Sequence, residues 1–244
     1  MSLTVTVLGS SGTYAGVDGA CSGFLVRSAG ATVMMDAGPG TLANLQRHAA
    51  PKDLDAVVLS HCHPDHWLEL PVLRNALKYV LECEGLDVFA TAETLEMATE
   101  VTGGKLETTF QPHVIEDLAE FSVGDQQWRC SRTDHPVETM GLRVDAGGRS
   151  LGYTADTGPA WSLAELGPVD LGLSEATFLH DSPERNPVHL SAHQAGAMAR
   201  AAGVGHLVIT HVLPTGSPEE SVVEAADAYG APVDVATLHR TFDV

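Results

Sequence analysis

The sequence predicts an α/β fold in which two mixed β-sheets face each other and helices cover their outer sides. Short apolar runs of strand length alternate with segments of helical spacing along the chain. Several of these runs end directly in histidine or aspartate, at the position where ligands gather in open α/β sheets. The chain has 244 residues, of which 44% are hydrophobic, so a single large domain over residues 1–244 has enough apolar material for an ample core.

The first half of the chain alternates between strand and helix patterns. The turn residues Ser28-Ala29-Gly30 separate two apolar runs and indicate a hairpin. The segment GSSGT, residues 9–13, lacks the phosphate-loop pattern, and we interpret it as a tight turn at the sheet edge. We expect strands at 3–8, 22–27, 31–36, 55–60 and 86–90, a short helix ending near 48, a helix at 68–81, and another from 92 to the break at Gly103-Gly104.

The second half of the chain predicts the second sheet. Gly147-Gly148 marks another hairpin, and Ser191 with Gln194 matches a helix capping box. We expect strands of this sheet at 108–113, 120–123 and 127–132, hairpin strands at 141–144 and 150–154, further strands at 171–175, 205–210 and 233–236, and helices at 191–202 and 217–229.

A dense cluster of candidate metal ligands lies in the segment SHCHPDH, residues 60–66. It follows a buried-strand pattern and contains His61, His63, Asp65 and His66. Imidazole and carboxylate groups suit zinc and similar divalent ions, whereas without an ion several buried polar rings would lack partners. The segment therefore predicts a metal site at a strand end. Cys62 points to the opposite face if the segment stays extended, so we do not count it as a ligand.

The pattern HxHxDH at the end of an apolar strand resembles the signature of the metallo-β-lactamase superfamily. The later residues of that signature have counterparts in the same order: His135 in TDHP, Asp156 in YTADTG and His211 in VITHV. The resemblance implies a four-layer αββα sandwich, in which Asp36 of DAGPG steadies the metal histidines from behind. It also implies two ions, one held by His61, His63 and His135, the other by Asp65, His66 and His211, with Asp156 bridging them.

Two further motifs resemble the ribonuclease Z branch of this superfamily. SEATF, residues 174–178, and HLSAHQAG, residues 189–196, are similar to its HEAT and HST motifs. The resemblance implies that Glu175 orients His189 and that His189 donates a proton to the leaving oxygen. Ser174 and Leu190 replace a histidine and a serine of these motifs, so the match is partial. His193, one turn further along, is the alternative proton donor.

The segment between His135 and Asp156 is too short for the basic, tRNA-gripping arm of long-form ribonuclease Z enzymes. Only twenty residues lie between these two positions, and they read as a hairpin. The formal charge is −19, with 13 Lys plus Arg against 32 Asp plus Glu and no basic run, so the surface disfavours long nucleic acid. The armless relatives of this branch include phosphodiesterases that act on small substrates such as cyclic nucleotides.

The residues and the resemblance together predict a dinuclear metal-dependent phosphodiesterase with Asp65, Glu175 and His189 as catalytic residues. A metal-bridging hydroxide is the expected nucleophile, because coordination lowers the pKa of water to about 7. Two dications offset by Asp65, Asp156 and hydroxide leave about one positive unit, which suits a small phosphodiester, above all a 3′,5′-cyclic nucleotide. Zinc is the expected metal, and manganese or iron also fits.

Two other activities stay open as alternatives. The first is RNA 3′-processing by a ribonuclease Z-like nuclease, which demands a basic surface and salt-dependent RNA binding. The second is hydrolysis of a thioester or lactone, for which the Glu175–His189 pair is unnecessary.

Composition predicts a cytoplasmic protein that does not enter a membrane. The four cysteines show no paired spacing and are expected to be reduced. No apolar run approaches the roughly 20 residues of a membrane span, and no secretory signal is visible at the N-terminus. The family resemblance further implies a homodimer.

Overall fold

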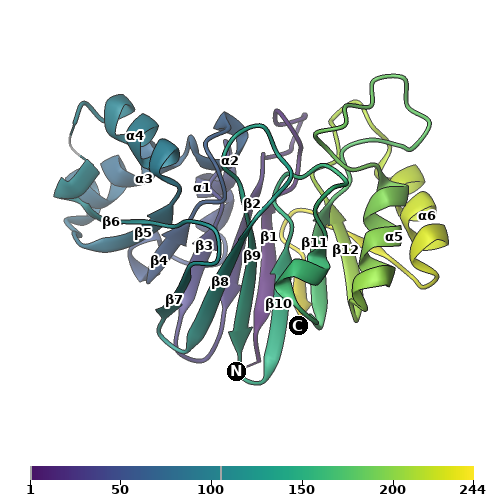
Figure 1. Cartoon of the computed structure of the whole chain (residues 1–244). Coiled ribbons are helices and arrows are strands. Elements are labelled where there is room, and N and C mark those ends of the chain that lie inside the picture. The colour runs from purple at the N-terminus through teal and green to yellow at the C-terminus, as the bar shows by residue number, and fades with distance from the viewer. Residues whose placement is uncertain (1, 105) are drawn as a thin grey trace.

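Two seven-stranded β-sheets form the framework of the molecule (Figure 1). The computed structural model describes residues 2–104 and 106–244. The first sheet has the strand order β14 (Thr241–Asp243), β1 (Thr4–Gly9), β2 (Gly23–Arg27), β3 (Thr32–Met35), β4 (Ala56–Val58), β5 (Leu86–Ala90), β6 (Phe110–Val114). The second sheet has the order β13 (Asp234–Val235), β12 (His206–Thr210), β11 (Leu171–Glu175), β10 (Arg149–Tyr153), β9 (Met140–Ala146), β8 (Gln126–Arg132), β7 (Glu120–Val123).

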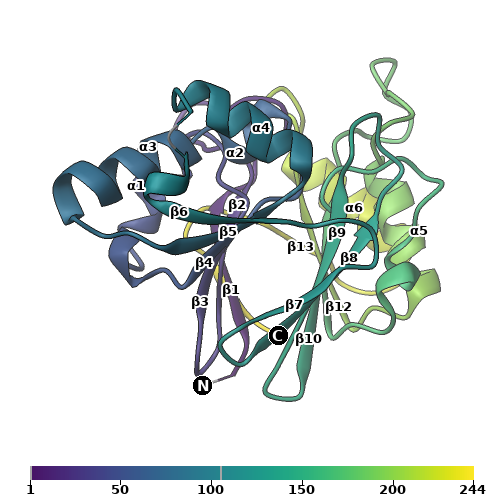
Figure 2. The ribbon, with the colours of Figure 1, turned by 60° about the vertical axis from the view of Figure 1, so that its left-hand side comes forward.

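Helices cover the outer face of each sheet, as Figure 2 shows. The first sheet carries α1 (Thr41–Leu45), α2 (Pro64–Trp67), α3 (Leu70–Ala76) and α4 (Ala92–Val101), and the second carries α5 (Ala192–Ala202) and α6 (Pro218–Tyr229). Short helical turns lie at Pro51–Asp53, Leu77–Leu81, Leu106–Thr108 and Leu163–Leu166. This layering confirms the expected αββα sandwich of two facing sheets.

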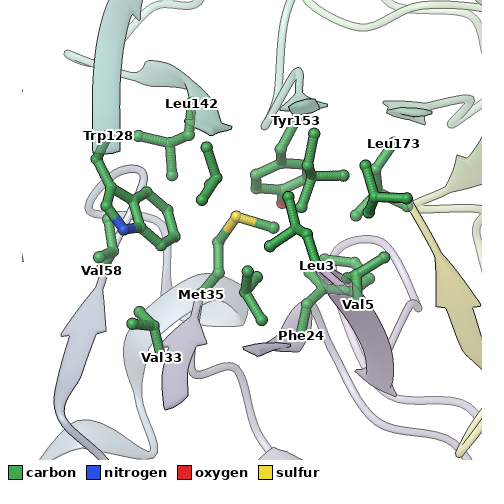
Figure 3. Packing of buried hydrophobic residues seen from close by; sticks show 14 of the residues in the cluster. Leu3, Val5, Phe24, Val33, Met35, Val58, Trp128, Leu142, Tyr153 and Leu173 are labelled. Atoms are coloured by element: carbon green, nitrogen blue, oxygen red, sulfur yellow. The ribbon is translucent and has the colours of Figure 1, made fainter. Parts of the chain in front are cut away.

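The hydrophobic core has three layers, one between the sheets and one beneath each set of helices. Between the sheets, Trp128, Leu142 and Tyr153 of the second sheet pack near Met35 and Phe24 of the first (Figure 3). Strands covered on both faces need apolar residues at consecutive positions. Every residue of β4 and of β11 is buried accordingly: β4 is a continuous apolar run, whereas β11 begins with Leu-Gly-Leu and ends in the buried Ser174 and Glu175.

Parallel strands bring the site loops of both sheets to one end of the sandwich. In the first sheet β3 to β6 run parallel, and in the second sheet β10 to β13 do so. The loops after β3, β4, β10, β11 and β12 meet at the upper end in Figure 1, while both chain termini lie toward the lower end. The carboxyl ends of the strands therefore face a common space, as expected for a ligand site.

One expectation about an individual element is wrong, and one strand has no counterpart in the sequence analysis. The strand predicted at 108–113 is β6 of the first sheet, because α4 forms a crossover that returns the chain parallel to β5. The helix predicted at 68–81 is confirmed within two residues: it runs from Leu70 to Leu81, its last part, Leu77–Leu81, is a wider π-helical turn, and it ends at the left-handed Glu82. β14 has no counterpart among the predicted strands, since three residues give little periodic signal. The other predicted strands and the helices at 191–202 and 217–229 agree within two residues.

No helix in the described part of the chain combines the length and hydropathy that crossing a membrane requires. All four cysteines lie in that part, and each is a free thiol. Burial, together with the nearby Glu93, raises the pKa of Cys62 to about 11, so this thiol is a poor metal ligand.

Candidate metal centre

The candidate ligands lie in loops that follow strands of both sheets. The first sheet supplies the segment after β4, and the second sheet supplies the loops after β8, β10 and β12. The structure brings together all seven residues singled out from the sequence: His61, His63, Asp65, His66, His135, Asp156 and His211. Their nitrogen and oxygen atoms fall into two adjacent groups.

The first group consists of His61, His63, His135 and Asp156, whose ligand atoms all lie within 4.8 Å of one another. His135 Nε2 is 3.2 Å from His63 Nδ1, and His61 Nε2 is 3.6 Å from Asp156 Oδ2. On its far side, the His135 ring uses Nδ1 to contact the carbonyl of Val188 at 3.1 Å. That nitrogen is therefore the donor, and the Nε2 lone pair of His135 is directed into the group.

The second group consists of Asp65, His66 and His211. His66 Nε2 and His211 Nε2 face each other at 3.4 Å, and Asp65 Oδ2 lies 3.3 Å from His211 Nε2. Asp156 Oδ1 lies 3.3 Å from each of these two ring nitrogens, whereas Asp156 Oδ2 faces the first group. One carboxylate therefore contacts both groups, each through a different oxygen.

The burial and charge of this cluster fit a divalent metal ion. Two of its buried atoms, His61 Nε2 and Asp156 Oδ1, have no hydrogen-bond partner among the described residues, although such atoms are rarely left unpaired. Burial lowers the pKa of His61 well below its usual value, which keeps the ring neutral and its lone pair available. Burial also opposes ionisation of Asp156, but the attraction of protons on the neighbouring His211 and His66, whose place a bound cation would take, outweighs it and holds the pKa of Asp156 well below normal. Neutral imidazole and ionised carboxylate are the groups that such ions bind.

Asp36, directly after β3, holds His66 from behind the site. Its Oδ2 accepts hydrogen bonds from His66 Nδ1 at 2.7 Å and from the Tyr153 hydroxyl at 2.9 Å. Ser60 donates both its N–H and its hydroxyl to the same carboxylate, at 2.8 and 2.9 Å. Because Nδ1 of His66 donates to Asp36, the lone pair of Nε2 points into the second group. This contact is the one that the family resemblance implies for Asp36.

The backbone enters the site through left-handed residues after three strands. Asp36, Ala155 and His211 have φ values of 56°, 50° and 58°. A residue with a side chain adopts this conformation at a cost of about 1–3 kcal/mol, and such strain recurs at functional sites. None of the three is glycine, so the sequence carries no local signal for these turns.

Glu175 and His189 form a pair beside the two groups. Glu175 Oε1 lies 3.1 Å from His189 Nδ1, and Nε2 of that ring has no hydrogen bond to any residue that the structure describes. Burial opposes protonation of His189, but the hydrogen bond to Glu175 and the charge of that carboxylate outweigh it and raise the pKa of His189 to about 9. Leu190, which replaces a serine of the motif, contributes its N–H to Glu175 Oε2 at 3.1 Å. His193 lies exposed on α5 with its ring beside His180, outside this pair.

The loop after β1 contacts the second group, a relationship that the interpretation of GSSGT as an edge turn missed. The Thr13 N–H donates to Asp65 Oδ2 at 2.8 Å. A Cβ added at Gly12 would lie 2.6 Å from His211 O and 2.8 Å from His211 Nδ1, so only glycine fits here. The available signal was a glycine-rich turn directly after an apolar strand, at the sheet end that carries the other ligands.

The predicted hairpin between His135 and Asp156 is confirmed. Its strands, β9 and β10, pair antiparallel around Gly147-Gly148 and form the centre of the second sheet. All residues between these two positions are described, and they fold into the sheet and its short loops without a projecting arm.

The protein is a metal-dependent hydrolase. Its two facing sheets carry a cluster of histidine and aspartate side chains at their strand ends, which is the arrangement of this class of enzyme. Residues 31–212 match the Beta-lactamase superfamily domain, and the chain belongs to this family. The fold and the histidine-rich segment thus agree with the family that the sequence motifs resemble.

Individual relatives extend the similarity over the whole chain. The uncharacterized protein Rv1339 of Mycobacterium tuberculosis is 36% identical over 256 residues, covering 100% of this chain and 93% of the relative. The probable metallo-hydrolase YhfI of Bacillus subtilis is 29% identical over 96% of this chain and 97% of its own. The crystal structure of YhfI covers 98% of both chains with a TM-score of 0.89 and 26% identity. Ribonuclease Z of Mycobacterium marinum is 29% identical over 98% of both chains.

Proposed function

We propose that the protein is a dinuclear metal-dependent phosphodiesterase that hydrolyses a small phosphodiester, above all a 3′,5′-cyclic nucleotide. The observation that carries this proposal is the position of Asp156, whose two oxygens face separate groups of ligands. Each group would hold one divalent ion, with Asp156 between them. A negative side chain at this place offsets the mutual repulsion of two dications, which is large at about 4 Å.

The residues of the chain have distinct roles around such a pair of ions. When bound, the ions would supply an activated water at neutral pH and positive charge for the phosphate. Asp65 would be held as a ligand by the Thr13 N–H, which donates to its Oδ2. Glu175 would orient His189 through Nδ1, so that the free Nε2 protonates the leaving oxygen. A cyclic nucleotide needs this proton, because its leaving group is a sugar alkoxide.

Charge and shape favour a small substrate over a long one. The net charge of −19 repels polyanions, and the segment between His135 and Asp156 adds no arm that could bind tRNA. A mononucleotide-sized diester carries a single negative charge and needs no extended basic surface.

We infer that zinc fills the site, since histidine nitrogen and carboxylate oxygen are its usual ligands, and manganese or iron also fits this donor set. Elemental analysis of the purified protein identifies the metal. We expect a homodimer in the cytoplasm, and light scattering of the purified protein measures the oligomeric state.

The test is hydrolysis by purified, metal-loaded protein. We expect metal-dependent release of a nucleoside monophosphate from a cyclic nucleotide, and cleavage of bis-p-nitrophenyl phosphate. Asp65→Ala and His66→Ala should abolish both activities, whereas Asp227→Ala, at an exposed position of α6, should leave them unchanged. A loaded wild-type protein that is inert on both substrates would overturn the proposal.

Ribonuclease Z-like RNA processing is the second candidate, because a relative of that name aligns with 98% of the chain. It requires RNA binding that weakens steeply with salt. A gel-shift titration without binding at low salt would eliminate it.

A thioester or lactone hydrolase is the third candidate, since the metal ligands alone could serve that reaction. Equal esterase rates in wild type and His189→Ala, without diesterase activity in either, would favour it over the phosphodiesterase.

A further inference from the structure

The hydroxyl of Thr177 lies between Glu175 and a candidate metal ligand. Thr177 Oγ1 donates to Glu175 Oε2 at 2.6 Å and lies 2.9 Å from His211 Nδ1. All three side chains are buried. The chain reaches this arrangement because Glu175 ends β11 and the Ala176 N–H donates to the carbonyl of Thr210 at the end of β12.

The single proton of the Thr177 hydroxyl determines which nitrogen of the His211 ring is protonated. A threonine hydroxyl has one proton, and here that proton is donated to Glu175. The second contact of the hydroxyl must then be accepted from His211, so His211 carries its proton on Nδ1. Its Nε2, which faces Asp65 and Asp156, consequently presents a lone pair.

Glu175 therefore acts on two imidazoles. Its Oε1 contacts His189 Nδ1 at 3.1 Å and accepts the Thr157 N–H at 2.6 Å, while its Oε2 accepts the Thr177 hydroxyl and the Leu190 N–H. The same carboxylate orients the proton donor directly and the metal ligand through one hydroxyl. Asp36 performs the equivalent task for His66 by direct contact.

We propose that Thr177 is a positioning residue, which transmits the orientation and charge of Glu175 to His211 and thereby sets the metal affinity of the second group. This inference rests on the proposed two-metal function. It gives the Glu175 carboxylate two tasks: placement of His189 and, through Thr177, support of the second ligand group. Binding of the second ion and placement of His189 therefore depend on the same side chain.

Substitution of Thr177 by Val separates this role from simple packing. Valine has nearly the same shape but no hydroxyl, so His211 Nδ1 would lose its partner and the ring would be free to turn. Loss of such a supporting contact behind a metal-binding histidine reduces metal affinity by roughly 10–100-fold. Thr177→Ser keeps the hydroxyl and should bind metal as the wild type does.

Thr210→Val is the matched control. Thr210 directly precedes His211 and is equally buried, but its hydroxyl has no hydrogen-bond partner among the described residues. This variant removes a buried threonine hydroxyl at the end of β12, next to His211 in the chain, without touching the Glu175 contact. It should keep wild-type metal affinity.

The experiment titrates Zn²⁺ into metal-free protein against a competing chelator and follows thermal unfolding of the metal-free forms in parallel. We expect two equivalents in the wild type, a roughly 10–100-fold weaker second equivalent in Thr177→Val, and unchanged affinities in Thr177→Ser and Thr210→Val. Activity of Thr177→Val on bis-p-nitrophenyl phosphate should recover as Zn²⁺ is raised. If Thr177→Val does not fold, Thr177→Ala makes the same comparison.

Two results would overturn the inference in different ways. A wild type that binds two equivalents, with Thr177→Val binding both equally well, would remove the role of Thr177 and leave the proposed function intact. A wild type that binds fewer than two equivalents would remove the dinuclear function itself and the inference with it.

Discussion

The hydroxyl of Tyr153 donates a hydrogen bond to Asp36 Oδ2 over 2.9 Å, and this contact joins the two sheets behind the metal centre. Tyr153 ends β10 of the second sheet, whereas Asp36 follows β3 of the first. The same oxygen accepts a hydrogen bond from His66 Nδ1 at 2.7 Å. Packing of the sheets and orientation of a candidate ligand therefore depend on one buried carboxylate.

Tyr153→Phe and Asp36→Asn should affect different properties. Phenylalanine keeps the ring but loses a hydrogen bond to a charged group, worth about 1.5–3 kcal/mol, so we expect a Tm lower by about 3–12 °C. Asp36→Asn removes the carboxylate behind His66 and should weaken metal binding about 10–100-fold. Calorimetry and metal titration measure the two effects. Wild-type metal affinity in Asp36→Asn would contradict the role given to this carboxylate.

Removal of metal should destabilise the protein. An ion that binds only the folded state stabilises it by about 2.7 kcal/mol when its free concentration is 100 times the Kd. For a chain of this size we therefore expect excess chelator to lower the Tm by at least about 5 °C, and added zinc to restore it. The Tm of His66→Ala, which lacks a ligand of the second group, should fall less when chelator is added. A Tm that is the same with and without chelator would argue against a metal centre.

His189→Ala should slow cleavage of a cyclic nucleotide far more than cleavage of bis-p-nitrophenyl phosphate. A sugar alkoxide requires a proton, whereas p-nitrophenolate leaves without one, so we expect kcat losses of about 10²–10⁴-fold and below about tenfold, respectively. His193→Ala, whose side chain is exposed on α5, is the control and should keep wild-type rates. Equal losses on both substrates would rule out proton donation by His189.

Gly12→Ala should disturb the second group through its backbone. The new Cβ would lie 2.6 Å from His211 O and 2.8 Å from His211 Nδ1, which forces the ring to move. We expect weaker metal binding and at least about tenfold lower activity at limiting metal. In Gly16→Ala, in the same loop, the new Cβ would contact only Pro214, whose nearest atom is a side-chain carbon at 3.2 Å, so the effect should be smaller. Assays of both variants over a range of zinc concentrations test this difference.

Ser191→Ala should lower stability without changing the chemistry of the site. The Ser191 hydroxyl accepts the Gln194 N–H and the Gln194 side chain accepts the Ser191 N–H, which completes the capping box of α5. Loss of such a cap costs about 1 kcal/mol, or about 2–4 °C in Tm for a chain of this size. Thermal unfolding measures the change, and Ser191→Thr, which keeps the capping hydroxyl at this buried position, should lose less stability than Ser191→Ala.

Much of the fold and most of the candidate site were predictable because their signals are local. The buried strands appear as continuous apolar runs, and four candidate ligands fall within one segment after β4. His135, Asp156 and His211 stand alone in the sequence, so only their order in a known pattern singled them out. The structure then brings all of these side chains within reach of each other.

The remaining features depend on neighbours that are distant in the sequence. Thr13 contacts Asp65 across 52 residues, and nothing near either residue indicates the pairing. Thr177 lies in the SEATF motif, but its contact with His211 forms only because β11 and β12 are neighbours in the sheet. The placement of β6 in the first sheet depends on the path of α4 rather than on the six residues predicted as a strand. These relationships are tertiary, and local patterns do not contain them.

The pairing of β1 with β14 has a consequence for how the chain acquires its fold. Thr6 and Thr241 share a hydrogen bond although 235 positions separate them. On a ribosome, β1 emerges long before β14, and one of its edges stays open until the residues between them have been made. An open strand edge is prone to pair with other chains. We therefore expect nascent chains stalled before β14 to aggregate more readily than chains that include β14 and to depend more on chaperones.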